Sequence, residues 1–543
     1  MKNIEILDCT LRDGGRVIDC KFNNDTIIGL GKLLIKARVN IIELGFLRDN
    51  VVYNGNSTFF SKVDEAEKFI AKIKNKRELD EAKFVLFVDY GLYDVAKLEK
   101  ANKNGITGIR FGFTKKDFYE KKEQLIKAME CIIDKGYDLY FQPVNTNGYN
   151  TRELEELIAI ANRIHPVAFA IVDTYGAMYL EDLEQIWIKV DRELRDDISI
   201  DFHSHNNMQM SFALSQRLIQ LSKKKRKLVI DATLNGMGKC AGNLNTELIV
   251  DYLVRKLDYN YDIDAIFDAI DQYLYPIKRD IYWGYSIPAF MAGIYRAHPN
   301  NVIYLTDKYR LNSKDIKYII SEIDEGTRQR YDYDNIRNIY RKYCATKIND
   351  DDAMHKLALE MTGKKVFVVA PGNSVNIFLE KVKNYILTER PIVICVNFVP
   401  KKFDYNYLFY ANTIHWERIC DTVDREKCIL SSNITVDFEQ TYRINYKRLI
   451  MEESFLCDNS TLMLLNLLND LNVKEIVMAG FDGFESNKEN YINDTFPNDK
   501  MMTKCKDINR EVNRLFQQYL KRVSENIKVR FLTESMYNEV NLS

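Results

Sequence analysis

The strongest constraint on the fold is a regular alternation of apolar runs and polar, helical stretches over residues 1–235. The apolar runs are short, rich in β-branched residues, and recur about every 30 residues, as the βα units of a barrel do. Runs that are apolar throughout suit strands buried on both faces, which is typical of parallel sheets. The pattern predicts a (β/α)8 barrel, with an open doubly wound sheet as the alternative. The expected strands cover residues 4–10, 39–46, 82–89, 105–113, 137–144, 167–174, 198–203 and 227–234.

The remaining chain divides into three parts. Residues 266–345 have a helical pattern, and residues 346–364 are polar and interrupted by a Gly, as expected of a linker. Strand signals then return in "KVFVVAPGNS", "PIVICVNF" and "VKEIVMAGFDG", which alternate with helical stretches and predict a small α/β domain with an open sheet. The predicted domains are therefore the barrel at 1–265, its helical extension at 266–345, the linker at 346–364 and a Rossmann-like α/β domain at 365–543.

Composition excludes several classes of protein. Hydrophobic residues make up 46% and charged residues 29%, as in globular proteins, and 77 basic residues balance 78 acidic ones. Because the formal net charge is only -1, we expect no nucleic-acid partner and no attraction to an anionic membrane. The N-terminus lacks the apolar core of a signal peptide, no apolar run reaches membrane-span length, and the ten cysteines form no CxxC pair. We expect a cytoplasmic protein with reduced thiols and no membrane partner; its oligomeric state, a homo-oligomer included, stays open.

Two of the six histidines lie together in "DFHSHNN", at the end of the seventh expected strand. His203 and His205 are two residues apart in an extended segment, so their side chains share one face. Asp13 follows the first strand, and the active site of a barrel lies at the carboxyl ends of its strands. Two imidazoles and a carboxylate bind divalent cations well. The spacing predicts a metal held by Asp13, His203 and His205, with unrelated histidines as the alternative.

Three further residues surround this predicted site. Arg12 can stabilise an enolate oxygen beside the metal, or form a salt bridge at the barrel end. Glu43, after the second strand, can brace Arg12 or Asp13, or form an ordinary ion pair. The loop "GMGKCAGN" at 236–243 is rich in glycine, which suits a phosphate site or brings the amide oxygen of Asn243 to the metal.

The motifs "LDCTLRDGG", "IIELGF", "FHSHNN" and "GMGKCAGNLNTE" together resemble the DRE-TIM metallolyase superfamily, the HMG-CoA lyase-like barrels. That superfamily contains 4-hydroxy-2-oxovalerate aldolases, HMG-CoA lyases, and isopropylmalate and homocitrate synthases. The resemblance covers about residues 1–300. It implies Mn²⁺ or Mg²⁺ held by Asp13, His203 and His205, Asn243 as a further ligand, and Arg12 as the residue that holds the enolate.

Other segments are closer to the aldolases than to the synthases. The similarity of "VDTYGAM" to the aldolases implies that Asp173 and Tyr175 line the pocket, and that of "YWGYSIPAFMAG" implies a catalytic tyrosine at Tyr285. Arg16 stands where the oxovalerate aldolases have a histidine acting as base, and arginine is a poor base. Either Tyr175, Tyr285 or a metal-bound water does that work, or the substrate differs and Arg16 binds an anionic group of it.

The function predicted from these residues is that of a divalent-metal-dependent aldolase, a carbon–carbon lyase. Its small-molecule partners would be a 2-oxo acid, supplying a pyruvate-type enolate, and an aldehyde. One alternative is an acyl-CoA lyase or synthase of the same superfamily. Another is a non-catalytic barrel that serves as a scaffold for the C-terminal domain.

The C-terminal domain carries its own candidate site. "VFVVAPGNSV" predicts a strand, a tight turn and a helix, an arrangement that can bind phosphate or be an ordinary connection. The order of motifs loosely resembles Rossmann-like domains of sialyltransferase-type enzymes. That resemblance implies a nucleotide or nucleotide-sugar site, and such a fusion would suit the synthesis of a surface-polysaccharide sugar. The candidate nucleotide-binding residues are Gly372, Asn373, Ser374, Asn397 and Asp482.

Overall fold

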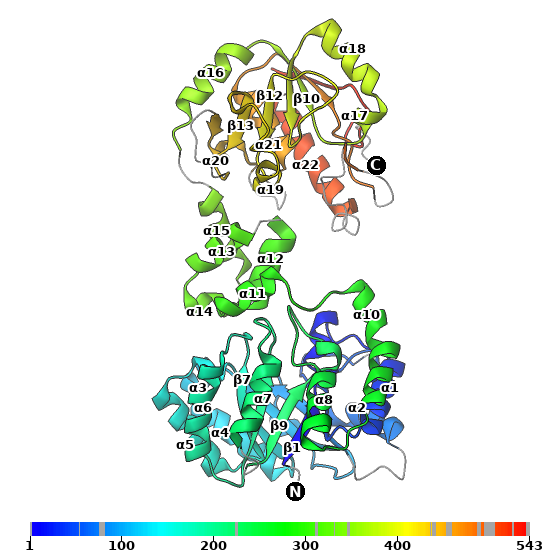
Figure 1. Ribbon diagram of the computed structural model, residues 1–543, viewed down its shortest axis with the longest axis vertical. Coiled ribbons are helices and arrows are strands. Elements are labelled where there is room, and N and C mark those ends of the chain that lie inside the picture. The colour runs from blue at the N-terminus through cyan, green and yellow to red at the C-terminus, as the bar shows by residue number, and fades with distance from the viewer. Residues whose placement is uncertain are drawn as a thin grey trace. The chain divides into compact units, whose positions relative to one another are not determined.

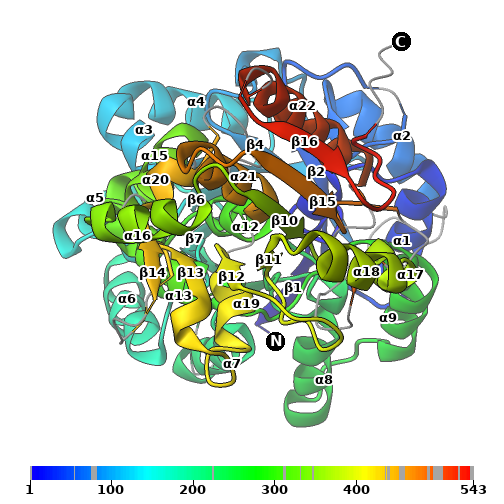
Figure 2. The same ribbon diagram turned by 90° about the horizontal axis from the view of Figure 1, so that it is seen from above.

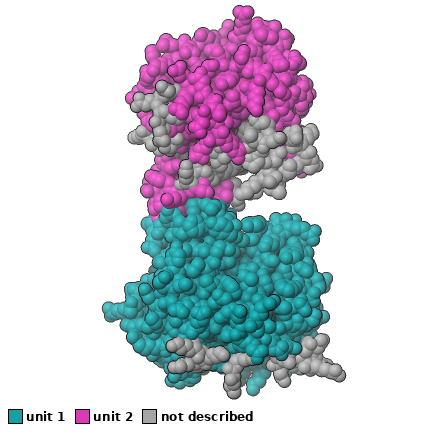
Figure 3. All heavy atoms as spheres, in the orientation of Figure 1, with its two compact units in different colours: residues 1–303, 324–331 teal, residues 304–323, 332–543 magenta. Residues whose placement is uncertain are grey.

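The computed structural model describes residues 3–538, apart from 54, 75–81, 223–225, 310–312, 331, 345–347, 435, 437–440, 452–458, 486–489, 493–504 and 524–525. The chain forms two compact units (Figure 3). The first unit holds residues 1–303 and 324–331, and the second holds residues 304–323 and 332–543.

The first unit is a closed barrel of eight parallel strands, so the predicted fold is confirmed. Each strand pairs with its neighbours in chain order, and β1 pairs with both β9 and β2, which closes the sheet (Figure 1). Most side chains in these strands are buried, as their apolar sequences require. The strands are β1 (Ile4–Asp8), β2 (Ile41–Leu47), β4 (Lys83–Asp89), β5 (Ile106–Phe113), β6 (Asp138–Pro143), β7 (Ala168–Asp173), β8 (Ser199–Ser204) and β9 (Leu228–Ala232).

Helices surround the barrel and bury one face each against it (Figure 1). Side-chain caps define where several begin: Asn23 accepts the Thr26 N–H at the start of α1, and Asn150 with Glu153 forms a capping box at the start of α5. The helices are α1 (Asn24–Lys36), α2 (Val63–Ile73), α3 (Lys115–Glu120), α4 (Lys122–Asp134), α5 (Thr151–Ile164), α6 (Leu180–Glu193), α7 (Ser211–Ser222) and α8 (Thr246–Leu257).

A short strand that the sequence did not predict, β3 (Phe59–Phe60), pairs with the end of β2. The register of β2 against β4 shifts between Glu43 and Phe46. Gly45 makes this shift possible, because a Cβ there would lie 2.0 Å from the carbonyl oxygen of Thr58. The result is an aromatic wall at the barrel end, where the rings of Phe46 and Phe59 lie 5.3 Å apart between centroids.

The segment predicted as a helical extension consists of short helices, and the two units divide it between them. The segment predicted as a linker contains α16 (Asp351–Met361). No helix among the described residues is long and apolar enough to span a membrane. The extension helices are α9 (Ile263–Ala269), α10 (Tyr275–Asp280), α11 (Ile287–Ile294), α12 (Pro299–Tyr309), α13 (Ser313–Glu322), α14 (Glu325–Arg328) and α15 (Tyr333–Cys344).

The second unit contains an open parallel sheet, so the prediction of a second α/β domain is confirmed. Its strand order is β14-β13-β12-β11-β10-β15-β16. From β10 the chain adds strands on one side as far as β14, and it then returns to add β15 and β16 on the other side of β10. Helices cover both faces, with α17, α18 and α19 opposite α20, α21 and α22 (Figure 2). The strands are β10 (Lys365–Val369), β11 (Ile392–Val396), β12 (Tyr407–Tyr410), β13 (Cys428–Ser431), β14 (Tyr442–Ile444), β15 (Glu475–Ala479) and β16 (Lys528–Phe531). The helices are α17 (Ser374–Ile377), α18 (Leu379–Glu389), α19 (Thr413–Glu417), α20 (Tyr446–Leu449), α21 (Ser460–Asp470) and α22 (Cys505–Val523).

Candidate active site

Asp13, His203 and His205 meet at the carboxyl end of the barrel strands. One ligand atom from each lies within 4.8 Å of the other two. His203 belongs to β8, His205 follows its last residue, and Asp13 lies in the turn after β1, so β9 alone separates the strands that supply them. His205 Nε2 is 3.8 Å from Asp13 Oδ2, and the two imidazole rings are perpendicular. We call these three residues the ligand triad, since one oxygen and two nitrogens at this separation suit a divalent cation.

The environment of the ligand triad keeps each member in its metal-binding form. Burial lowers the pKa of His203 and of His205 to about 4, so both imidazoles are neutral near pH 7. Burial alone would raise the pKa of Asp13, but the neighbouring positive charge of Arg12 outweighs it and holds that pKa well below its usual value. Metal ligands must be deprotonated to bind, and all three are.

Asn243 offers a further oxygen beside the triad. Its Nδ2 donates to Asp13 Oδ2 and to the carbonyl oxygen of Met237, both at 3.0 Å. Its Oδ1 is buried and has no hydrogen-bond partner among the described residues. Gly242, with φ of 81°, allows this loop to close tightly, because a Cβ there would lie 1.8 Å from the oxygen of Gly236. A buried, unpaired amide oxygen is costly, and a cation held by the triad would satisfy it.

Arg12 provides a fixed positive charge next to Asp13. Its Nε donates to Glu43 Oε2 and its Nη1 to Asp13 Oδ1, each at 2.6 Å, and its guanidinium carbon lies 4.5 Å from the Phe87 ring centroid. Burial alone would lower the pKa of Arg12, but Glu43 and Asp13 outweigh it and raise that pKa. Arg12 therefore stays charged and held in one orientation, and Glu43 is the residue that braces it.

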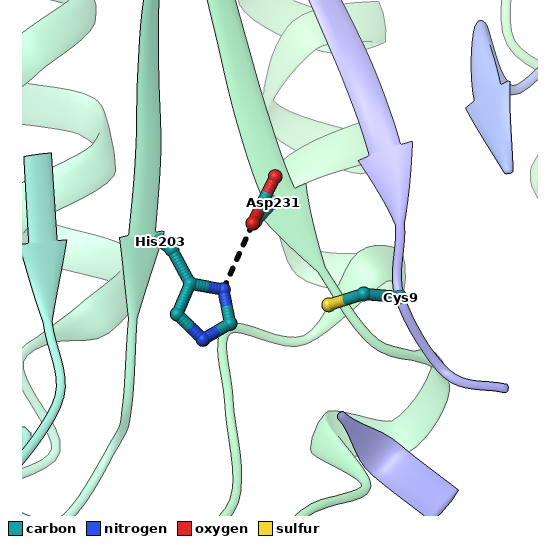
Figure 4. Close-up of side chains that lie close together, drawn as sticks. All are labelled: Cys9, His203 and Asp231. Carbon is teal, nitrogen blue, oxygen red and sulfur yellow. Dashed lines mark hydrogen bonds and ion pairs between the residues drawn. The ribbon is translucent and has the colours of Figure 1, made fainter. Parts of the chain in front are cut away.

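Behind the triad lies a buried charge network that the sequence analysis missed. Asp231 Oδ2 contacts His203 Nδ1 at 2.9 Å (Figure 4). Asp231 also forms a short ion pair with Arg110. Arg110 further contacts Glu43 at 3.1 Å and Asp201 at 2.8 Å, and its side chain is fully buried. The available signal was the presence of charged residues inside apolar strands, in "GIRFGF" and "VIDA". Their effect is to place the His203 proton on Nδ1 and to leave Nε2 free to bind a metal.

Cys9, His203 and Asp231 form a second group with the separation of metal ligands (Figure 4). Asp231 is already engaged by Arg110 and His203. Cys9 donates to the carbonyl oxygen of Ala232 at 3.4 Å, and burial raises its thiol pKa well above the usual value. A protonated thiol and an ion-paired carboxylate are poor metal ligands. The role of this group is therefore to hold His203 in place through Asp231.

The other predicted site residues of the barrel differ in whether they contact the ligand triad. Arg16 Nε contacts Asp13 Oδ1 at 3.2 Å. Asp173 is buried and accepts the N–H groups of Ala177 and Met178, so it serves the turn after β7, and burial raises its pKa to about 6. Tyr175 donates to the carbonyl oxygen of Gln329 at 3.3 Å. Tyr285 is 49% exposed, and no contact among the described residues joins it to the triad.

In the second unit, the predicted nucleotide-binding residues lie at the carboxyl ends of β10, β11 and β15. The N–H and hydroxyl of Ser374 donate to the Asp482 carboxylate at 2.8 and 2.5 Å, and Gly372 bonds to the Gly480 oxygen. Asp482 therefore occupies the donors that a phosphate would need. Asn373 is the N-cap residue of α17, and the Oδ1 of Asn397 is buried without a partner among the described residues. The nucleotide site stays a prediction.

Comparisons with known proteins concern the barrel. The model of the HMGL-like family matches residues 3–272. The 4-hydroxy-2-oxovalerate aldolase of Geobacillus genomosp. 3 is 26% identical over 277 residues, which cover 50% of this chain and 77% of that protein. The enzyme of the same name from Geobacillus thermodenitrificans is 22% identical over 323 residues, or 58% of this chain and 89% of that protein.

Among solved structures, the HMG-CoA lyase of Brucella melitensis aligns at 14% identity with a TM-score of 0.41. The alignment covers 52% of this chain and all of that one (100%).

Proposed function

We propose that this chain, whose residues 3–272 belong to the HMGL-like family within the DRE-TIM metallolyase superfamily, is a divalent-metal-dependent aldolase. The reaction would make or break the bond between a pyruvate-type enolate and an aldehyde, as in a 4-hydroxy-2-oxo acid. One observation carries the proposal: the ligand triad of Asp13, His203 and His205 lies beside the buried cation of Arg12. The names of the aldolase relatives support it.

The ligand triad would hold the cation, with Asn243 Oδ1 as a further oxygen donor. When bound, a divalent cation acts as a Lewis acid that polarises the 2-oxo group of the substrate. The oxygen donors of Asp13 and Asn243 suit Mn²⁺ or Mg²⁺, and the metal-dependence test below distinguishes these two ions.

Arg12 would stabilise the negative charge that develops on the 2-oxo oxygen. In the cleavage direction, the proton of the 4-hydroxyl leaves, the electrons of that O–H bond form the aldehyde carbonyl, and the C3–C4 electrons form the enolate. Arg12 is held by Glu43 and Asp13, so its remaining N–H donors need no reorganisation when this charge appears. Protonation of C3 then yields pyruvate.

The cleavage step also needs a base for the 4-hydroxyl proton. Arg16 cannot serve, because an arginine stays protonated. Burial raises the pKa of Tyr175 to about 12, which favours a role as a hydrogen-bond donor over a role as a base. The role suggested for Tyr285 stays a prediction.

The test measures pyruvate release from 4-hydroxy-2-oxo acids with Mn²⁺ or Mg²⁺, and again after EDTA treatment. We expect metal-dependent release in the native protein and its loss in His203→Ala. His165→Ala is the matched control, since His165 is half exposed and pairs with Asp197 on the outside of the barrel. Metal-dependent activity that survives in His203→Ala would contradict the ligand assignment, and a barrel that binds metal without turnover would favour a scaffold.

For the second unit, the nucleotide or nucleotide-sugar site is kept as a separate proposal. It is supported by the reversal of strand order between β10 and β15, where ligands bind in open parallel sheets, and by the buried oxygen of Asn397, which has no hydrogen-bond partner in the described part of the chain. Calorimetric titration with nucleoside mono- and diphosphates and nucleotide sugars, repeated on Asn397→Ala, tests it. Equal heats for native and variant protein would contradict the assignment of Asn397.

A further inference from the structure

Arg16 is anchored at the mouth of the barrel, in the turn of Gly14–Ile18 that follows Asp13. One of its N–H groups contacts Asp13 Oδ1, and its guanidinium carbon lies 4.7 Å from the centroid of the Phe46 ring. The side chain is 35% exposed. Arginine carries five N–H donors in a planar fork, so most of them remain for a ligand.

Arg48 lies against the same aromatic wall. Its guanidinium carbon is 5.2 Å from the Phe46 ring and 5.6 Å from the Phe59 ring, and its Nη2 pairs with Asp89 at 2.6 Å. The Nε of Arg48 is buried and has no hydrogen-bond partner among the described residues. An unpaired, buried guanidinium N–H is costly and favours an anion nearby.

Lys239 approaches from the loop 236–243. This loop packs on the turn of Arg16, since a Cβ at Gly14 would lie 3.3 Å from the carbonyl oxygen of Met237. Lys239 is half-buried in this loop, and burial, together with the positive charge of Arg16, lowers its pKa. Within the described part of the chain, Lys239 forms no ion pair.

The charges at the mouth do not cancel. Arg12 pairs with Glu43 and Arg48 pairs with Asp89. Asp13, the partner of Arg16, is also the proposed ligand of a divalent cation, which would draw on the same carboxylate. Arg16 and Lys239 therefore keep positive charge that no carboxylate in this cluster is dedicated to neutralise.

We propose that Arg16 and Lys239, with Arg48 behind them, form a subsite for a second anionic group of the substrate. This inference rests on the aldolase function proposed above and specifies its substrate class. The aldehyde partner would carry a carboxylate or a phosphate, which a planar arginine fork and a lysine recognise by charge-assisted hydrogen bonds. A short neutral aldehyde would give Lys239 no anionic partner and would leave Arg16 with Asp13 alone, so it would be the poorer substrate.

The test compares kcat/KM for the addition of pyruvate to three aldehydes: acetaldehyde, succinic semialdehyde and glycolaldehyde phosphate. We expect the native protein to prefer one anionic aldehyde over acetaldehyde by about tenfold or more, the worth of one charge-assisted hydrogen bond. Arg16→Gln and Lys239→Gln should each lower this preference by about tenfold. Lys21→Gln is the matched control and should keep the native preference, because Lys21 is 74% exposed and pairs with the exposed Asp19.

Two results would overturn the subsite. One is a native protein that uses all three aldehydes equally well. The other is a pair of variants that lose activity equally with every aldehyde through a higher KM for pyruvate, which would assign the cations to the 2-oxo acid carboxylate. Because Arg16 contacts Asp13, the Mn²⁺ affinity of Arg16→Gln should also be measured by calorimetry. An unchanged affinity shows that the substitution has not disturbed Asp13.

Failure of the aldolase function has a different signature. Exchange of the pyruvate methyl protons in D2O reports enolate formation without any aldehyde. If the methyl protons exchange but the protein shows no preference among the aldehydes, the aldolase function is supported and the subsite is contradicted. If there is neither exchange nor product, the aldolase function itself is contradicted. In that case titration with inorganic phosphate decides: binding that Arg16→Gln weakens about tenfold supports an anion site, and equal binding excludes it.

Discussion

Replacing Asp231 with asparagine tests whether the carboxylate behind His203 prepares that ring to bind a metal. Asp231 Oδ2 accepts the His203 Nδ1 proton at 2.9 Å and pairs with Arg110. Asparagine has the same shape and keeps an oxygen acceptor, but it removes the charge that makes the imidazole a stronger ligand. Loss of such a partner typically weakens metal binding by about 10- to 100-fold. Because the asparagine oxygen can still accept from Nδ1, we expect the lower end, or ~1.4 kcal/mol.

The assay is calorimetric titration of Mn²⁺ into protein stripped with EDTA, for native, Asp231→Asn and Asp8→Asn. Asp8 is the matched control: it is a buried aspartate at the end of the neighbouring strand β1, and it bonds to Thr10 and Thr246. Urea unfolding of each variant should accompany the titration, since Arg110 loses one of its three carboxylate partners in Asp231→Asn.

The reasoning is refuted if Asp231→Asn binds Mn²⁺ within about twofold of the native affinity, because the Asp231 charge would then have no effect on metal binding by His203. An equal loss of Mn²⁺ affinity in Asp8→Asn would indicate instead that either substitution disturbs the structure of the barrel end in general.

Three further predictions concern the same barrel. Arg12→Lys should lower kcat by about 100-fold or more, because lysine cannot hold both Glu43 and Asp13 while donating to the substrate; single-turnover kinetics measures this. For Asp8, burial raises the pKa to about 6 from an ordinary 3.8, so its stabilising contribution is present below pH 4 and is lost as pH rises through 6. Between pH 4 and 7, the free energy of unfolding of the native protein should therefore fall by up to ~3 kcal/mol more than that of Asp8→Asn. Identical pH profiles for the two proteins would contradict the raised pKa. Gly242→Ala should lower the Tm and weaken Mn²⁺ binding, because φ is 81° there and a Cβ would meet the Gly236 oxygen at 1.8 Å; an unchanged Tm would show that the loop can relax.

The barrel fold, and the meeting of Asp13 with His203 and His205 at its carboxyl end, could be predicted because both depend on local patterns. Apolar runs at regular spacing define parallel strands, and the rule that barrel sites lie at strand ends connects Asp13 with His203 and His205 across 190 residues of chain. The short strand β3 was not predicted, because it has only two residues, Phe59 and Phe60, and two residues show no periodicity.

The network of Asp231, Arg110 and Asp201 could not be predicted in the same way. Each residue is a single charge within an apolar strand, and its partners come from other strands whose register decides which side chains meet. The same holds for Ser374, whose donors looked available in sequence and are occupied by Asp482 in the folded sheet.

The amino-acid sequence by itself determined the number and order of the barrel strands and the ends at which polar residues gather, since these follow from hydrophobic periodicity. Only the tertiary structure decided which charges pair inside the barrel, and that the side-chain oxygen of Asn243 is buried with no hydrogen-bond partner among the described residues. Those features depend on distances of a few ångströms between residues far apart in the chain, and such distances are set by packing.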